Sequence, residues 1–320
     1  YSRVTTSMSE ATWLGRKAWE WAIGIGLRRA DKIIAGEALG ALERLRYGIA
    51  DRLVFSNIKK VLGLDRTRNA ASGAAPISPA LLRWFLALDI AIEELWGQTE
   101  LGIITCTLKG KFRFGTVGPA MPGTEVRIAD NGEIVARSDG QFSGYLNLPD
   151  KTAETLVDGW VHTGDVGELD DEGNLSITDR LKDIIITAGG KNITPSVMEN
   201  ELKFSPYISD AVIIGDARKF LTCLIMIDQE NVEHYAQTHS IPFTDYRSLC
   251  ARPEIVELID GEVARVNSGF SSVEQVKKFR LIDVLLTAED EELTPTMKLK
   301  RSFVSEKYAG LIDSMYTKSA

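Results

Sequence analysis

The sequence predicts an α/β protein with two parts: a large first domain that ends in a small β-rich subdomain, and a smaller second α/β domain. Strand-like and helix-like segments alternate over residues 63–109 and again after residue 182, which is typical of helices packed on a parallel sheet. Over residues 110–181, short strand-like segments are joined by tight turns instead, which indicates antiparallel sheet.

Length and composition limit the class of protein. A chain of 320 residues is long enough for two domains, and 44% hydrophobic against 26% charged residues is ordinary for a globular protein. The net charge of −8 argues against a protein that binds nucleic acid through its phosphate backbone. No apolar run is long enough to span a membrane and no secretory signal is present, so we expect a cytoplasmic protein. Because the chain begins at Tyr1 without a Met, we expect it to be a piece of something longer.

Cysteine and histidine patterns point to no metal centre. The cysteines are odd in number and far apart, at Cys106, Cys223 and Cys250, which favours reduced structural thiols over a disulfide framework. The three histidines are equally scattered, and no paired metal-ligand spacing occurs. We therefore expect no transition-metal site.

The first segment, residues 8–62, is predicted to be helical because apolar residues recur three or four positions apart. Three tryptophans crowd its beginning: Trp13, Trp19 and Trp21. They indicate packing against the core or against a missing neighbour; the alternative is peripheral contact with a membrane surface, which a polar face without marked basicity disfavours. The stretch Gly24–Arg29 contains a G-x-G but lacks the third glycine and the preceding strand of a dinucleotide fingerprint.

Residues 63–109 predict a strand, a turn, a helix and a second strand. The first strand is expected at Arg66–Ser72, followed by the turn Gly73–Pro76 and by a helix with Ser78 as N-cap and Pro79 at its first position. The second strand is expected at Asp89–Leu95, ending in Trp96-Gly97-Gln98-Thr99-Glu100. In parallel sheets, ligand-binding residues gather at these carboxyl ends.

The subdomain over residues 110–181 is predicted from two hairpins. One pairs Thr124–Ala129 with Glu133–Arg137, and the other pairs Val166–Leu169 with Leu175–Thr178. The domain boundary is expected at residues 180–182, so the first domain is 1–181 and the second is 182–320. The second domain is predicted to contain strands at Asp183–Thr187, Ala211–Ile214 and Thr222–Asp228, and helices that begin at Thr194-Pro195, Gln229 and Glu254.

Six short segments carry residues that a nucleotide site needs, namely backbone or aromatic groups for the base, an acceptor for the ribose and cations for phosphates. They are Ser72–Pro76, Trp96–Glu100, Gly159–Asp165, Asp179–Asp183, Gly189–Lys191 and Leu293–Lys298. Gly190-Lys191 is not a Walker A motif, because Asn192 follows it. Together and in this order, the segments resemble the adenylate-forming superfamily, and most closely its long-chain fatty acyl-CoA synthetases, from about Arg52 to the C-terminus.

The resemblance implies an ATP- and Mg²⁺-dependent ligase. Such enzymes join a fatty acid to AMP, release pyrophosphate, and pass the acyl group to the thiol of coenzyme A. A small, mobile C-terminal domain rotates between the two half-reactions. This chain would be the C-terminal half, and its partners would be the fatty acid, ATP, coenzyme A and the missing N-terminal half. The family's loop for the β- and γ-phosphates of ATP lies upstream of the matched region, and nothing in Tyr1–Leu62 resembles it.

The resemblance also implies a role for each matched residue of the first domain. Gly73, Ala74 and Ala75 would read the adenine edge with their backbone, because small side chains permit close approach. Trp96 stands where Tyr is usual and would cover the adenine. Thr99 would bind the α-phosphate, and Glu100 would bind Mg²⁺.

The remaining matched residues follow near and beyond the boundary. Asp165 would accept hydrogen bonds from the ribose hydroxyls, and Arg180 would hold the ribose or phosphate side. Lys182 matches the hinge. Gly189-Gly190-Lys191 resembles the glycine turn beside the pantetheine tunnel. Lys298 matches the lysine that contacts both the attacking carboxylate and the α-phosphate.

Other interpretations stay open. Singly, the segments are explained by a tight turn, a core tryptophan, a surface salt bridge between Asp165 and Arg180, and solvated lysines. Met297 and Gln98 depart from the family pattern, which bears on rate and detail more than on the reaction class. The rival functions are a ligase that delivers the acyl group to a carrier protein and a nucleotide-binding module without catalysis; retention of Glu100, Asp165 and Lys298 disfavours the second.

Overall fold

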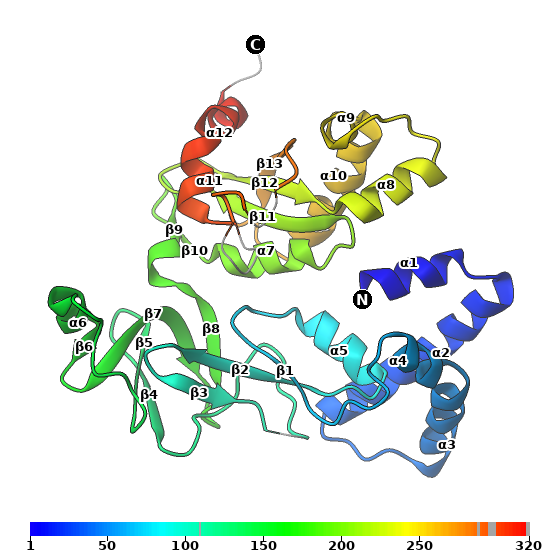
Figure 1. Ribbon diagram of the computed structural model, residues 1–320, viewed down its shortest axis with the longest axis horizontal. Helices are drawn as coiled ribbons and strands as arrows, with labels where there is room; N and C mark the ends of the chain where they lie inside the picture. Colours follow the sequence, from blue (N-terminus) through cyan, green and yellow to red (C-terminus); the bar gives the residue numbers. More distant parts are fainter. Residues whose placement is uncertain (109, 287–288, 294–298, 318–320) are drawn as a thin grey trace. The chain divides into compact units, whose positions relative to one another are not determined.

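The structure is a computed structural model that describes residues 1–108, 110–286, 289–293 and 299–317. The chain divides into two compact units, Tyr1–Leu181 and Lys182–Ala320, and Figure 1 colours it from blue at the N-terminus to red at the C-terminus. Within the described residues, no helix is both long and apolar enough to cross a membrane.

The first unit begins with a group of helices (Figure 1). They are α1 (Ser2–Glu10), α2 (Trp13–Ile34), α3 (Ala41–Ala50), a π-helical turn (Asp51–Phe55) and α4 (Ser56–Val61). Thr12 caps α2 by accepting a hydrogen bond from the backbone N–H of Gly15. The expected helical region is therefore helical, but it is divided by loops and by the π-turn.

The three early tryptophans differ in their surroundings. The Trp19 ring packs edge-on against Phe55, at 6.3 Å between centroids, and also contacts Trp84 of α5 (Pro79–Ala87). The side chains of Trp13 and Trp21 are 64% and 45% exposed. Of the interpretations offered for this cluster, core packing holds for Trp19 alone. In α2, a Cβ at Gly26 would stand 2.6 Å from the carbonyl oxygen of Ala87. The glycine therefore allows the helix to pack closely, and the stretch Gly24–Arg29 is not a dinucleotide-binding loop.

A three-stranded sheet follows, in the order β1 (Ala70–Ser72), β2 (Ile92–Gln98), β3 (Gly102–Cys106). The strand β1 is parallel to β2 and is joined to it through α5 (Pro79–Ala87), while β3 is antiparallel to β2. As predicted, Ser78 caps α5 and Pro79 is its first residue.

Two strand boundaries differ from the prediction. Residues 66–69 stay outside β1, because only Ala70–Ser72 have partners in β2. The second strand begins at Ile92 instead of Asp89, whose φ of +65° follows the end of α5 and is incompatible with a strand. It continues through Gln98, since Leu95–Gln98 pair with β3. Trp96 and Gln98 therefore lie within the strand rather than after it.

The β-rich subdomain is an antiparallel sheet. Its strands are β4 (Thr124–Ile128), β5 (Glu133–Ser138), β6 (Leu156–Val157), β7 (Trp160–Leu169) and β8 (Leu175–Arg180), with the short helix α6 (Pro149–Thr155) before β6. Both predicted hairpins, β4–β5 and β7–β8, are confirmed. The strand β7 is longer than expected and pairs with β5, β6 and β8, so it lies inside the sheet.

The second unit is built around the sheet β11 (Ile208–Ile214), β12 (Leu221–Ile227), β13 (Val276–Leu281), with β12 in the middle and fully buried. Successive side chains of β12 point to opposite faces of the sheet. Cys223 and Ile225 therefore pack with one set of helices, and Leu224 packs with another. The first set is α7 (Pro195–Lys203), α8 (Gln229–Thr238), α9 (Tyr246–Cys250) and α10 (Pro253–Asn267); the second is α11 (Arg301–Lys307) and α12 (Ala309–Tyr316).

Several elements of this unit were expected, and others were missed. The helices α7, α8 and α10 and the strands β11 and β12 correspond to predicted elements, although the Thr194 side chain does not cap α7. The strand expected at Asp183–Thr187 is reduced to β9 (Ile185–Ile186), which pairs with β10 (Asn192–Ile193), because Leu181–Asp183 form a 3₁₀ turn. The strand β13 and the helices α9, α11 and α12 were not anticipated.

Candidate nucleotide-binding site

The first part of the candidate site lies at the carboxyl ends of β1 and β2. Because these strands are parallel, with Ser72 opposite Glu94, the loop Gly73–Ala75 and the segment Thr99-Glu100 follow at the same edge of the sheet. Gly73 has little room for a side chain: a Cβ there would stand 3.1 Å from the carbonyl oxygen of Leu95 in β2. The loop therefore runs close beside β2.

Ala74 holds an uncommon backbone conformation in this loop. Its φ is +63°, in the left-handed region that side chains disfavour. Such conformations cost about 1–3 kcal/mol and are concentrated at functional sites. The exposed, small side chains of Ala74 and Ala75 leave the backbone of this turn accessible.

A hydrogen-bonded cluster joins β2 to β7. Trp96 donates its indole N–H to Oδ2 of Asp165 at 2.9 Å, and the Gln98 amide donates to the same oxygen at 3.1 Å. Gln98 also donates to the carbonyl oxygen of Thr163 at 2.8 Å. Arg180, opposite Asp165 in the β7–β8 pair, brings its Nε to 3.4 Å from Oδ1. The cluster therefore unites three predicted site residues, from β2, β7 and β8.

Trp96 makes a contact that the sequence did not suggest. Its side chain is buried, 8% exposed, and its indole nitrogen is committed to the carboxylate expected to hold the ribose. Its role as cover for the adenine stays a prediction. Gln98, noted in the sequence only as a departure from a pattern, belongs to the same hydrogen-bonded cluster.

Glu133 of β5 is a further site residue that the sequence analysis missed. This buried carboxylate accepts from the backbone N–H of Gly164 at 2.9 Å and contacts Nδ1 of His162 at 2.9 Å. Thr163 donates its hydroxyl to the carbonyl oxygen of Ile134 at 2.6 Å. These contacts fix the segment of β7 that presents Asp165. The only hint in the sequence was the position of Glu133 directly after a hairpin turn.

Glu100 lies in the turn between β2 and β3, next to Thr99. Its Oε1 accepts a hydrogen bond from the Tyr145 hydroxyl at 2.5 Å, and its backbone carbonyl accepts one from the N–H of Phe142 at 2.8 Å. Among the described residues, none donates to Oε2 of Glu100. These residues also contain no cluster of three His, Cys, Asp or Glu side chains that could hold a metal. One carboxylate fits Mg²⁺, which takes its remaining oxygen ligands from phosphates and water.

Four predicted residues of the second unit that the structure describes lie in exposed positions. Lys182 is exposed within the 3₁₀ turn at the start of the unit. Gly189, Gly190 and Lys191 form the exposed turn between β9 and β10, where the Gly190 N–H donates to the carbonyl oxygen of Thr187 at 2.8 Å. Gly190 has a φ of +75°, which explains the glycine.

Lys298 and its neighbours Thr294–Met297 lie outside the described residues. The ends of this segment are joined, since Leu293 and Leu299 form an isolated antiparallel bridge. Just after it, Arg301 donates to Glu199 of α7 at 2.6 Å and to the carbonyl oxygen of Ile213 at 2.7 Å. Burial raises the pKa of Glu199, and the Arg301 charge opposes that rise.

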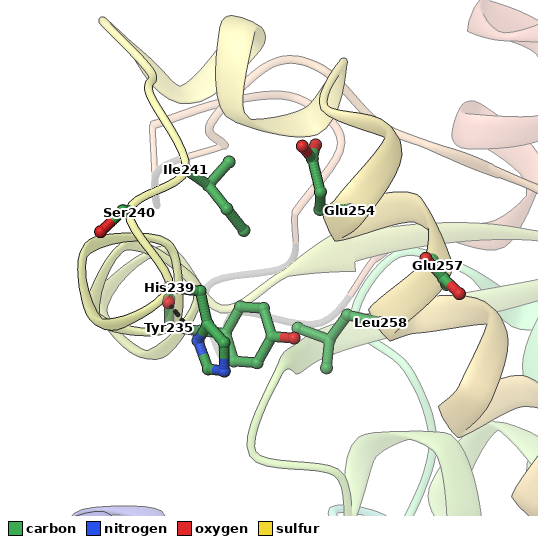
Figure 2. A pocket seen from close by; sticks show the side chains of 7 residues that line it. All are labelled: Tyr235, His239, Ser240, Ile241, Glu254, Glu257 and Leu258. Atoms are coloured by element: carbon green, nitrogen blue, oxygen red, sulfur yellow. Dashed lines mark hydrogen bonds between the residues drawn. The ribbon is translucent and has the colours of Figure 1, made fainter.

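A cavity of about 490 Å³ lies in the second unit, between the end of α8 and the start of α10 (Figure 2). The rings of Tyr235 and His239 stack there at 4.0 Å between centroids, and the carboxylates of Glu254 and Glu257 come from α10. None of the predicted site residues lines this cavity.

Family models match both parts of the chain. The AMP-binding enzyme family matches residues 35–146, and the AMP-binding enzyme C-terminal domain matches residues 182–320. The chain belongs to the AMP-binding enzyme family. The resemblance to adenylate-forming enzymes is thereby confirmed, and the second match begins at the first residue of the second unit.

Curated relatives in this family are similar over most of the chain. Long-chain-fatty-acid–CoA ligase FadD15 of Mycobacterium bovis is 40% identical over 87% of this chain and 47% of its own length. The putative fatty-acid–CoA ligase fadD11 of Mycobacterium tuberculosis is 37% identical over 97% of this chain and 55% of its own length. The chain spans about half the length of these relatives.

Solved structures share the fold. The adenylation domain of a carboxylate reductase from Mycobacterium chelonae aligns with a TM-score of 0.67 at 23% identity, over 93% of this chain and 45% of that one. The corresponding domain from Segniliparus rugosus, solved with AMP and a carboxylic acid, aligns with a TM-score of 0.65 at 20% identity, over 92% of this chain and 45% of that one. The predicted α/β class is confirmed as the fold of adenylation domains.

Proposed function

We propose that this chain is the C-terminal part of a long-chain fatty acid–CoA ligase that uses ATP and Mg²⁺ to form an acyl-adenylate and then a thioester with coenzyme A. The proposal extends to this chain the activity named for relatives that are 40% and 37% identical, of which it spans about half. Residues 1–181 would belong to the large domain and residues 182–320 to the C-terminal domain.

The observation that carries the proposal is the cluster of Trp96, Gln98, Asp165 and Arg180 beside the loop Gly73–Ala75. The Asp165 carboxylate is buried, and three side chains from two other strands contact it. Burying a charged group costs desolvation free energy, and a buried ion pair often contributes little net stability in return. We therefore favour a binding role for this carboxylate over a purely structural one. Its partners fix the orientation of Asp165, so that its remaining acceptor capacity is preorganised for the hydroxyls of a ribose.

The residues at the strand ends supply the rest of the proposed nucleotide site. The accessible backbone of Gly73–Ala75 would recognise the edge of the adenine, and the Thr99 hydroxyl would donate to the α-phosphate. Glu100 would hold Mg²⁺ with the oxygen that no described residue occupies. The metal would neutralise charge that develops on the phosphates as pyrophosphate departs.

The second unit would serve both half-reactions. Lys298 would place its ammonium against the fatty acid carboxylate and the α-phosphate, which lowers the repulsion between two anions. The exposed turn at Gly189-Gly190 would leave room for the pantetheine arm of coenzyme A, and Lys182 would be the hinge.

The experiment joins this chain to the sequence that precedes it in its gene, which we call the complete enzyme. It is incubated with ATP, Mg²⁺, fatty acids of graded length and either coenzyme A or an acyl carrier protein, and the products are identified by mass spectrometry. We expect acyl-CoA with long chains preferred. An acylated carrier protein without acyl-CoA would support the rival ligase, and no acyl-adenylate under any condition would refute the proposal.

A further inference from the structure

The side chain of Tyr145 forms a hydrogen bond with Glu100 from a part of the sequence that no site motif includes. Its hydroxyl donates to Oε1 of Glu100 at 2.5 Å across 45 positions of sequence. This bond raises the pKa of the Tyr145 hydroxyl, because the neighbouring carboxylate opposes ionisation of the phenol. The contact joins the segment after β5 to the turn between β2 and β3.

Tyr145 is itself held by its own segment. Its ring packs edge-on against Phe142 at 4.9 Å between centroids, and the Lys151 ammonium lies 5.0 Å from the ring centroid. Its backbone N–H donates to the Thr152 hydroxyl at 2.9 Å. Before it, Gly144 has a φ of +144°, and a Cβ there would stand 2.7 Å from Cγ2 of Thr152. The phenol is thus presented by a closely packed turn.

The two tethers act on different parts of Glu100. The N–H of Phe142 holds its backbone carbonyl at 2.8 Å, while Tyr145 holds one carboxylate oxygen. A glutamate side chain has three rotatable bonds and loses rotamer entropy when it is fixed. Because Tyr145 holds Oε1, the carboxylate loses this rotamer entropy on folding rather than on binding a metal. Its Oε2 accepts no hydrogen bond from the described residues.

We infer that Tyr145 is a positioning residue that orients the Glu100 carboxylate for a divalent cation bound with the phosphates of ATP. The inference rests on the proposed function, because it takes Glu100 as the metal ligand. The alternative is that Tyr145 only ties its segment to the β2–β3 turn, as the Phe142 N–H does.

The test measures how much Mg²⁺ strengthens ATP binding, by calorimetric titration of ATP with and without the metal, in the complete enzyme. Four proteins are compared with the wild type: Tyr145→Phe, Glu100→Gln, the double variant, and Lys151→Met. Lys151→Met is the matched control, since it removes a contact to the same ring but keeps the hydroxyl. Thermal unfolding of each protein reports any loss of structure.

We expect Tyr145→Phe to reduce the Mg²⁺ enhancement about fivefold to thirtyfold, which corresponds to about 1–2 kcal/mol of lost orientation. Glu100→Gln should remove most of the enhancement, and the double variant should lose no more than Glu100→Gln, because Tyr145 acts through Glu100. Lys151→Met should behave as the wild type.

Two results would separate this inference from the proposed function. If Glu100→Gln removes the Mg²⁺ enhancement but Tyr145→Phe keeps it, only the positioning role of Tyr145 is overturned. An enhancement that is absent in the wild type, or that survives Glu100→Gln, would overturn the metal role of Glu100 and the inference with it. A further loss in the double variant would also overturn the inference, since Tyr145 would then act by another route.

Discussion

The indole nitrogen of Trp96 donates a hydrogen bond of 2.9 Å to the carboxylate of Asp165, although 69 positions of sequence separate the two residues. Both side chains are buried, at 8% and 6% exposure. The bond joins the βαβ part of the first unit to its antiparallel subdomain. Any change to either residue should therefore affect both nucleotide binding and the stability of this unit.

Replacing Trp96 by Phe should lower the stability of the first unit and its affinity for AMP. Because a hydrogen bond to a charged group is lost, we expect the free energy of unfolding to fall by about 1.5–3 kcal/mol, measured by urea unfolding. We expect the affinity for AMP to fall roughly tenfold, measured by calorimetry. Trp84→Phe is the control for lost volume, because the Trp84 side chain is also buried and no described residue accepts a hydrogen bond from its indole nitrogen. Equal effects of both changes on AMP affinity would contradict the prediction.

Replacing Asp165 by Ala in the complete enzyme should weaken ATP binding about tenfold to a hundredfold, which is the loss of roughly 1.5–3 kcal/mol for a charged acceptor. Titration of ATP measures it. Asp170→Asn is the matched control, since Asp170 lies in the β7–β8 turn of the same hairpin and accepts hydrogen bonds from Asn174. If Asp165→Ala binds ATP as tightly as the control, its carboxylate is structural.

Glu94 should make the stability of the first unit depend on pH. Burial raises its pKa from 4.5 to about 7, so the folded state holds this proton more tightly than the unfolded state. Stability should therefore fall as the pH rises from about 4.5 to about 7, by at most roughly 3 kcal/mol, and stay lower above that range.

The glutamine of Glu94→Gln cannot ionise, so the stability of this variant should not fall over that pH range. It should be more stable than the wild type at about pH 8, but not at about pH 5. Urea unfolding at the two pH values measures the difference. Glu93→Gln, on the opposite face of β2, should keep the wild-type dependence. A fall that persists in Glu94→Gln would mean that another group titrates.

Gly189→Ala should separate folding from coenzyme A use. An added methyl group would meet only the Thr187 hydroxyl, at 3.9 Å, so the free energy of unfolding should change by less than about 0.5 kcal/mol. If the turn borders the path of pantetheine, the KM for coenzyme A should rise while acyl-adenylate formation is unchanged. Gly97→Ala gives the contrast: its methyl group would overlap the carbonyl oxygen of Gly102, and we expect a loss of about 2–4 kcal/mol in stability. An unchanged KM for Gly189→Ala would leave this glycine a purely local turn.

Lys298→Ala should slow acyl-adenylate formation about a hundredfold to a thousandfold, which is the typical loss for one preorganised contact to a developing charge. If the ammonium serves only the first step, thioester formation from supplied acyl-adenylate should proceed normally. Lys300→Ala, at the exposed N-cap of α11, is the control and should retain both rates. Equal loss of both half-reactions in a folded Lys298→Ala protein would refute the assignment.

Local chemistry in the sequence determined many of the elements. The turns Asp130-Asn131-Gly132 and Asp170–Gly173 imposed both hairpins, since Gly132 and Gly173 adopt the positive φ angles that these turns need. Ser78 followed by Pro79 determined the start of α5, because each suits one position of a helix N-terminus. The order of short motifs along the chain was enough to indicate the family, which two family models then matched.

Tertiary structure alone decided the limits of the strands and the partners of the site residues. The strand β2 extends to Gln98 because β3 pairs with it, and no local signal in Trp96–Gln98 predicts that pairing. The contacts of Asp165 with Trp96 and of Tyr145 with Glu100 join residues far apart in sequence, and they exist because β7 and the segment after β5 fold back onto β2 and its turn. A sequence motif names the residue types that a site needs, whereas the packing of distant strands determines which donor reaches which acceptor.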